Sequence, residues 1–217
     1  MSITLGVYEL FAYTIPGILY LYIANEFLGL LGFKHLEFKD LDNIGINILL
    51  LIVSYVFGQG LNFLAAKWRR LFQQKEATIE AIEKLKKNHP YLKIKFAPSD
   101  WPVLQSIIRQ YHPETVTNNE RNKAISIMMQ NISLSFLIYT FYQSIQFFLN
   151  GFSVENLAFA ITSFIATFLS RNRSRIYNQW FYDHIYEAAL SYNPNTIEII
   201  KIVQGGKASA TIFSRKK

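Results

Sequence analysis

The chain has 217 residues and a formal net charge of +7, with 51% hydrophobic residues and a mean hydropathy of +0.14. Its apolar residues form uncharged runs of 24 residues at 43–66 and 31 residues at 124–154, whereas a membrane-spanning helix needs about 20. This pattern excludes an ordinary soluble domain, and the absence of cysteine excludes disulfides and thiolate chemistry.

Four membrane-spanning helices are predicted along the chain. The first and the last contain shorter uncharged runs, of 16 residues at 10–25 and 15 residues at 156–170. Because the first ten residues contain no Lys or Arg, the first segment is interpreted as a retained helix rather than a signal peptide. The predicted spans are 5–30, 44–66, 126–149 and 155–171.

The distribution of basic residues predicts the orientation in the membrane. Of the 22 Lys and Arg residues, 12 lie between Lys67 and Lys123 and 8 lie from Arg171 onward. Since cytoplasmic loops are enriched in Lys and Arg, both regions and both termini are expected in the cytoplasm. Two basic regions on the same side need an even number of crossings between them, which favours a fourth span.

The predicted fold is therefore an all-α membrane protein with four parts: a first transmembrane helix pair (1–66), a cytoplasmic helical insert (67–125), a second transmembrane pair (126–171) and a tail (172–217). In the insert, we expect a helix from Gln73 to Asn88, an extended piece at 91–96 and a helix from an N-cap at Ser99 to Tyr111. The polar stretch from Glu114 to Lys123 is expected to continue into the third span. The tail is expected to begin as an amphipathic helix, with Tyr177, Trp180, Phe181 and Tyr182 at the interface, and to end in a β-hairpin within 196–213.

Polar residues inside the spans are costly in hydrocarbon and usually face partners or water. Glu9 is either a sensing carboxylate or an interfacial residue near the headgroups, and the second reading is favoured. The amides of the third span predict either a hydrogen-bonded seam between helices or the wall of a wet pore. Gly58-Gln59-Gly60 predicts close helix packing, and Pro16-Gly17 predicts a kink. The candidate intramembrane residues are Glu9, Gln59, Asn62, Asn131, Gln143 and Gln146.

After the fourth span, Arg171, Arg173, Arg175 and Trp180 are candidate contacts with lipid or a partner, although ordinary positive-inside anchoring is the favoured explanation. Catalytic signals are missing: there is no P-loop, no GxSxG and no HExxH, and the four histidines lack the spacing of metal ligands. We therefore expect no enzymatic activity, no metal and no cofactor.

Three segments carry a resemblance to a group of known proteins. They are Val7-Tyr8-Glu9-Leu10-Phe11-Ala12-Tyr13-Thr14-Ile15-Pro16-Gly17, the polar run 119–123 that leads into Asn131-Ile132-Ser133-Leu134, and Arg171-Asn172-Arg173-Ser174-Arg175-Ile176-Tyr177. They resemble small bacterial membrane proteins of phage-defence loci, such as the membrane subunit of the Kiwa defence pair and the membrane effectors of CRISPR and cyclic-nucleotide defence. The resemblance implies an oligomeric membrane component that senses infection or damages the membrane.

The leading hypothesis is a non-enzymatic homo-oligomer of the inner membrane that senses membrane perturbation and docks a soluble cytoplasmic protein in antiviral defence or stress. The alternative is a pore-forming effector channel that depolarises the membrane, opened by a nucleotide ligand bound to lysines of the insert. A small secondary transporter is less favoured, because the two halves show no inverted repeat. Direct nucleic-acid binding is not expected.

Overall fold

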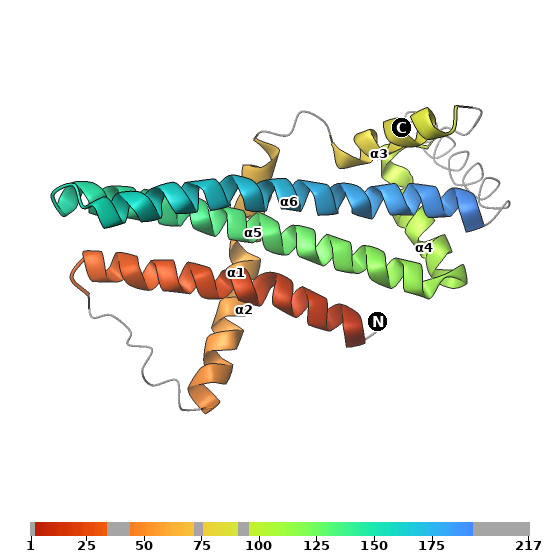
Figure 1. Cartoon of the computed structure of the whole chain (residues 1–217). Coiled ribbons are helices and arrows are strands. Elements are labelled where there is room, and N and C mark those ends of the chain that lie inside the picture. Colours follow the sequence, from red (N-terminus) through yellow and green to blue (C-terminus); the bar gives the residue numbers. More distant parts are fainter. Residues whose placement is uncertain (1–2, 34–43, 72–75, 91–95, 193–217) are drawn as a thin grey trace, which may run out of the picture. The chain divides into compact units, whose positions relative to one another are not determined.

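The computed structural model describes residues 3–33, 44–71, 76–90 and 96–192, and within these ranges all regular secondary structure is helical. Six α-helices and one short 3-10 helix follow each other along the chain (Figure 1). They are α1 (Ile3–Leu30), α2 (Ile44–Arg70), α3 (Ala77–Asn88), η2 (Pro98–Asp100), α4 (Trp101–Tyr111), α5 (Pro113–Leu149) and α6 (Val154–Tyr192).

Three of these helices, α1, α2 and α5, are long and apolar enough to cross a membrane. The prediction of an all-helical fold with helices of membrane-spanning length is thus confirmed for the described residues. The helix α6 is not among the three, because its apolar first half is followed by charged and polar residues up to Tyr192. The structure supports three of the four predicted spans.

Several local predictions can be compared with the structure. The polar stretch 114–123 does continue into the third span, since α5 runs unbroken from Pro113. The N-cap prediction at Ser99 is wrong: Asp100 occupies the N-cap of α4, and its carboxylate accepts a hydrogen bond of 2.8 Å from the backbone N–H of Ala97. The predicted hairpin within 196–213 and residues 91–95 of the extended piece lie outside the described residues, and α3 is described from Ala77.

The chain divides into two compact units. The membrane unit comprises residues 1–74 and 121–177, and the insert unit comprises residues 75–120 and 178–217. Both α5 and α6 contribute residues to each unit without a break in the helix.

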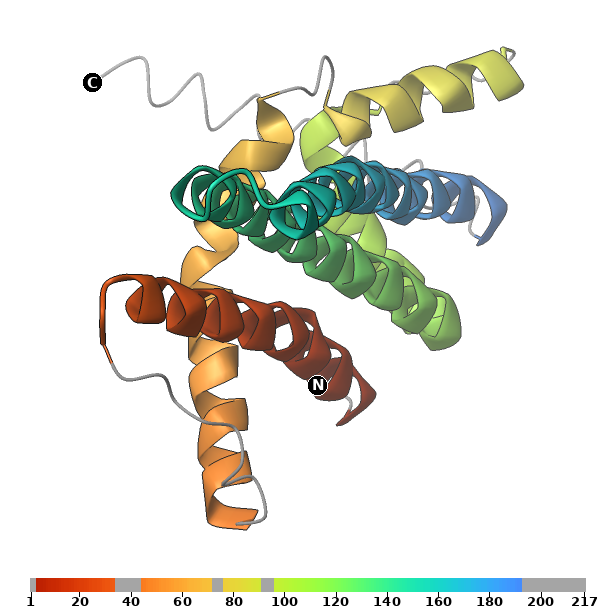
Figure 2. The same cartoon turned by 60° about the vertical axis from the view of Figure 1, so that its left-hand side comes forward.

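In the membrane unit, α2 crosses α1 at two points where a glycine meets the other backbone (Figures 1 and 2). A Cβ atom on Gly17 would lie 1.7 Å from the carbonyl oxygen of Ser54, and one on Gly58 would lie 2.0 Å from that of Tyr13. Only a residue without a side chain fits at these points. The prediction of close packing at 58–60 holds for Gly58, whereas a Cβ on Gly60 would meet no atom within 4 Å.

Within the membrane unit, α5 and α6 run side by side in both views (Figures 1 and 2). The turn that joins them has positive φ at Gly151 and at Phe152, both 66°. Within the membrane unit, three hydroxyl contacts connect the two helices at successive levels, namely Ser126 with Ser174, Ser133 with Thr167, and Thr140 with Ser163.

The insert unit has a conventional apolar core. Leu104, Ile185 and Tyr186 are fully buried, and Phe181 is buried against the ring of Trp101 at a centroid distance of 5.6 Å. The expectation that Phe181 lies at the membrane interface is therefore wrong, because its ring packs inside this core. The remaining members of the core are Ala81, Ile82, Leu85, Phe96, Ile108, Val116, Ala188 and Ala189.

One salt bridge joins α3 to α6 beside this core. The Lys84 ammonium lies 2.5 Å from a carboxylate oxygen of Asp183. The hydrogen bond with Asp183 raises the pKa of Lys84 above its usual value. The pair connects the two helices at the edge of the core.

Candidate functional site: a polar seam inside the membrane unit

A cluster of amide groups lies where α1, α2 and α5 meet. The side-chain oxygen of Asn62 accepts hydrogen bonds from Gln130 Nε2 at 3.2 Å and from Asn131 Nδ2 at 3.1 Å. The Tyr20 hydroxyl of α1 donates to the backbone oxygen of Asn131 at 2.8 Å. Asn131 is fully buried, and its Oδ1 accepts no hydrogen bond within the described part of the chain. We call Tyr20, Asn62, Gln130 and Asn131 the amide seam.

A second set of polar contacts fixes α6 to the other helices. Ser133 Oγ donates to the backbone oxygen of Thr167 at 2.8 Å and lies 3.1 Å from the donor Nε1 of Trp68. Ser126 and Ser174 each donate their hydroxyl to the other's backbone oxygen at 2.8 Å. These contacts satisfy hydroxyl groups that would be costly to bury alone.

Further along α5, polar side chains are bonded in i, i+4 steps. Gln143 Nε2 donates to the Tyr139 hydroxyl at 2.6 Å, and Gln146 Nε2 donates to the Tyr142 hydroxyl at 3.1 Å. The Tyr142 hydroxyl in turn donates to a carboxylate oxygen of Glu26 on α1 at 3.2 Å. The amides of α5 therefore point toward groups of the same chain.

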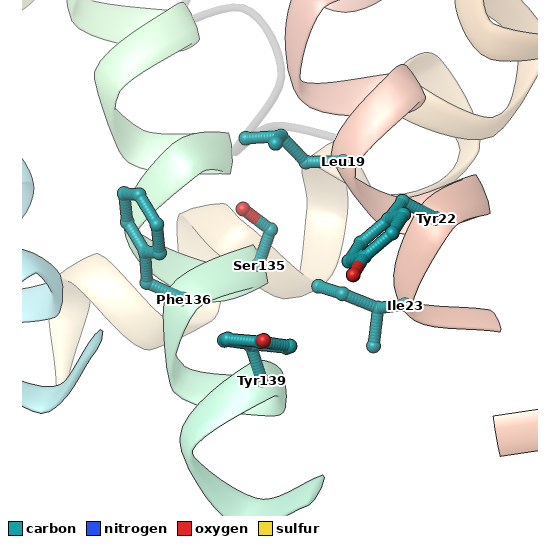
Figure 3. Close-up of a pocket in the computed structure, with 6 residues that line it drawn as sticks. All are labelled: Leu19, Tyr22, Ile23, Ser135, Phe136 and Tyr139. Atoms are coloured by element: carbon teal, nitrogen blue, oxygen red, sulfur yellow. The ribbon is translucent and has the colours of Figure 1, made fainter. Parts of the chain in front are cut away.

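A pocket of about 190 Å³ opens between α1 and α5 (Figure 3). The rings of Tyr22 and Tyr139 lie 6.4 Å apart at their centroids, and the Ser135 hydroxyl donates to the backbone oxygen of Ile132. Pockets that hold drug-sized ligands and cofactors have about 300–1,000 Å³, so this one suits a short apolar chain better than a nucleotide. Its walls are formed by Leu19, Tyr22, Ile23, Ser135, Phe136 and Tyr139.

The structure separates the candidate residues into two groups. Asn62, Asn131, Gln143 and Gln146 make the hydrogen bonds described above, which favours the seam over a pore wall. Glu9 and Gln59 are exposed on the surface of the membrane unit and take no part in the seam.

Sequence reasoning missed the contributions of Tyr20, Trp68 and Ser133 to these contacts. Tyr20 shows no polar pattern with its neighbours, and Trp68 lies just past the second predicted span, where interfacial rings are common. Their roles depend on which face of each helix meets α5, and this follows from the tertiary packing.

The four candidate contacts with lipid or a partner differ in their exposure and in the unit to which they belong. The Arg171 guanidinium lies 5.8 Å from the centre of the Trp68 ring. Arg173 and Arg175 are exposed in the membrane unit, and Trp180, which is 44% exposed, belongs to the insert unit.

Among the described residues, no group of three or more His, Asp or Glu side chains could hold a metal ion. Comparisons with protein families, with curated proteins and with solved structures found no match to this chain.

Proposed function

We propose that the chain is a non-enzymatic, homo-oligomeric component of the bacterial inner membrane that senses membrane perturbation and docks a soluble cytoplasmic partner in an anti-phage defence or stress system. Both termini and the insert unit lie in the cytoplasm in this proposal, and α6 provides the fourth span. The defence role comes from the resemblance of residues 7–17, 119–134 and 171–177, and the sensing role comes from the amide seam.

The observation that carries the proposal is the amide seam at Asn62 and Asn131. Hydrogen bonds between membrane helices contribute on average only about 0.6 kcal/mol each. The buried Oδ1 of Asn131 already accepts no hydrogen bond among the described residues. Thinning of the bilayer or entry of water would therefore rearrange this contact at low cost. Because α5 also supplies residues 113–120 to the insert unit, a change in its packing would reach the cytoplasm.

The fourth span is supported by the register between α5 and α6. The three hydroxyl contacts occur at residues 126, 133 and 140 of α5, and their partners at residues 174, 167 and 163 of α6 run in the opposite direction. The apolar half of α6 thus lies against the part of α5 that is predicted to lie in the membrane. If α5 crosses the bilayer, this half of α6 crosses with it.

Homo-oligomerisation is supported by the exposed face of α2. Gln59 presents its amide in the middle of α2, among exposed side chains that are large and apolar, including Ile52, Val56 and Phe63. An amide facing hydrocarbon is costly, and the same face of a second copy would provide its hydrogen-bonding partner.

The proposal is tested by affinity purification from native membranes and by phage plating in a bacterial host that expresses the chain with its neighbouring genes. We expect co-purification of a second tagged copy and a soluble companion, and protection that is weakened by Asn131→Leu. The control is Thr162→Val, because the exposed Thr162 hydroxyl donates to the Ala158 backbone of its own helix. Recovery of this chain alone, or plating efficiency unchanged by the wild-type chain, would contradict the proposal.

The ligand-gated pore receives less support, since the amides that would line it are bonded within the chain. Ion flux from liposomes that contain the purified protein, opened by a nucleotide, would reverse this preference.

A further inference from the structure

We infer that the pocket between α1 and α5 binds one phospholipid of the bilayer, by an ester carbonyl and the acyl carbons next to it. The inference rests on the membrane location in the proposed function, and it adds a ligand class to the sensing role. Tyr22 and Tyr139 are the hydrogen-bond donors to the carbonyl in this proposal, and the apolar side chains around them hold the acyl chain.

The pocket is flanked by contacts that hold α1 and α5 together. Toward one side, the Tyr20 hydroxyl donates to the backbone oxygen of Asn131 at 2.8 Å, and toward the other, the Tyr142 hydroxyl donates to the Glu26 carboxylate at 3.2 Å. The lining residues of α5, which lie within 135–139, fall between these two contacts along the helix. Because both sides are bonded, the pocket is a preformed part of the packing.

Two tyrosine hydroxyls supply hydrogen-bond donors at this pocket. Figure 3 shows the Tyr22 side chain pointing from α1 toward the α5 side, where Tyr139 lies. Gln143 Nε2 donates to the Tyr139 oxygen at 2.6 Å, which leaves the Tyr139 proton for another acceptor. Within the described part of the chain, neither hydroxyl donates to a protein atom. An acceptor oxygen on a ligand would satisfy both donors, which are costly to leave unbonded in hydrocarbon.

The size and charge of the pocket select the neutral part of a lipid. Its volume is about 190 Å³, and a dry apolar cavity of about 150 Å³ holds one benzene molecule. The pocket therefore admits an ester group with a few methylene groups. Leu19, Ile23 and Phe136 provide apolar walls, and none of the six lining residues is charged. A phosphate would find no cation among them, whereas an acyl ester finds both apolar contact and donors.

The position along the helices matches the level of lipid esters. Glu26 is the last charged residue of α1, and it lies one helical turn after Tyr22. On α5, Gln143 likewise lies one turn after Tyr139. One turn rises about 5.4 Å, so the two tyrosines lie just inside the polar boundary that Glu26 and Gln143 mark. Tyrosine is enriched at this interface, where the ester groups of a phospholipid join its hydrocarbon chains.

Native mass spectrometry of the full chain, released from nanodiscs, tests the inference. The nanodiscs contain equal amounts of a diester and a diether phosphatidylcholine, which share the headgroup and differ in the carbonyl. We expect the wild-type chain to retain the diester lipid about threefold or more over the diether lipid, as one hydrogen bond contributes about 1 kcal/mol. The double variant Tyr22→Phe/Tyr139→Phe should abolish this preference, because it removes both hydroxyls and keeps both rings.

A control and a second variant separate the site from general effects. The matched control is Tyr8→Phe/Tyr55→Phe, which removes two hydroxyls from α1 and α2 outside the pocket lining and should keep the preference. Leu19→Trp fills the pocket with a larger side chain and should abolish the preference without removing any hydroxyl.

Four results would overturn the inference. Equal retention of both lipids by an inserted wild-type chain would remove the site and leave the proposed function intact. An equal loss in the Tyr8→Phe/Tyr55→Phe control would assign the preference to tyrosines in general. Retention of an added prenylated quinone in place of the diester lipid would identify a different carbonyl ligand. Failure of the chain to enter nanodiscs would contradict both the site and the proposed function.

Discussion

The membrane unit and the insert unit bury opposite kinds of side chain. In the membrane unit the buried positions are rich in small and polar residues such as Ala65, Ser54 and Asn131, while large residues such as Ile44 and Leu49 are 76% and 60% exposed. In the insert unit the large apolar residues Leu104 and Ile185 are fully buried.

The difference shows how the solvent decides the packing. Water drives large apolar side chains into the interior of the insert unit. Lipid tails are as apolar as leucine, so they provide no such force between membrane helices, and close backbone contact and hydrogen bonds take its place. The inverted pattern of the membrane unit is what the proposed membrane location requires.

The largest expected effect is in the insert unit. Leu104→Ala removes a fully buried side chain from a water-driven core, and we expect a loss of about 2–5 kcal/mol in the free energy of unfolding of this unit. Hydrogen exchange of α3 and α4 in nanodiscs measures this loss. The contrasting variant is Ile52→Ala, at a 56% exposed position of α2, where we expect a change within about 0.5 kcal/mol. Similar losses of unfolding free energy in both variants would show that the two units do not differ in how they bury large apolar side chains.

A smaller effect is expected at the crossing of α1 and α2. In Gly58→Ala the new methyl group would lie 2.0 Å from the Tyr13 carbonyl oxygen, so the helices must separate at a cost of about 1–3 kcal/mol. Thermal unfolding in detergent measures this cost. Gly60→Ala is the matched control, because nothing lies within 4 Å of its added methyl group and alanine is the better helix former. Equal destabilisation by both changes would contradict the close contact.

The amide seam should contribute less than the crossing. Asn62→Leu removes the oxygen that two amides share, and we expect a loss of about 1–2 kcal/mol in unfolding free energy. A double-mutant cycle with Gln130→Leu should be non-additive, because either change breaks the same bond. A cycle with Thr140→Val, whose partner Ser163 lies on α6, should be additive. Additivity in both cycles would show that the seam does not exist in the membrane.

The smallest effect concerns the Lys84–Asp183 salt bridge. Because the folded pKa of Lys84 is raised above the ordinary 10.5, its contribution to stability is fully present below that pH and is lost as the pH rises through the folded pKa. The Lys84 side chain is 48% exposed, so screening by water keeps this contribution below about 1 kcal/mol. Between pH 9 and 12, the free energy of unfolding of the insert unit should fall in Lys86→Met as it does in the wild type. In Lys84→Met this part of the fall should be absent.

The sequence by itself indicated which segments are apolar enough to lie in a membrane, and it indicated most helix ends. Runs of 24 and 31 uncharged residues admit only a membrane helix or a buried one, and His112-Pro113 marks the boundary that α4 and α5 share. The N-cap of α4 is Asp100, one residue after the predicted Ser99, and the Asp100 carboxylate accepts a hydrogen bond from Ala97. Such a local contact depends on backbone geometry that composition does not reveal.

Only the tertiary structure decided which polar residues work together. Gln59 and Asn62 are amides three residues apart on α2, yet Gln59 is exposed while Asn62 binds Gln130 and Asn131 across the seam. The direction in which α2 crosses α1, fixed by Gly17 and Gly58, sets which face of α2 meets α5. That direction results from contacts between helices distant in sequence, so it becomes visible only when their backbones are placed in space.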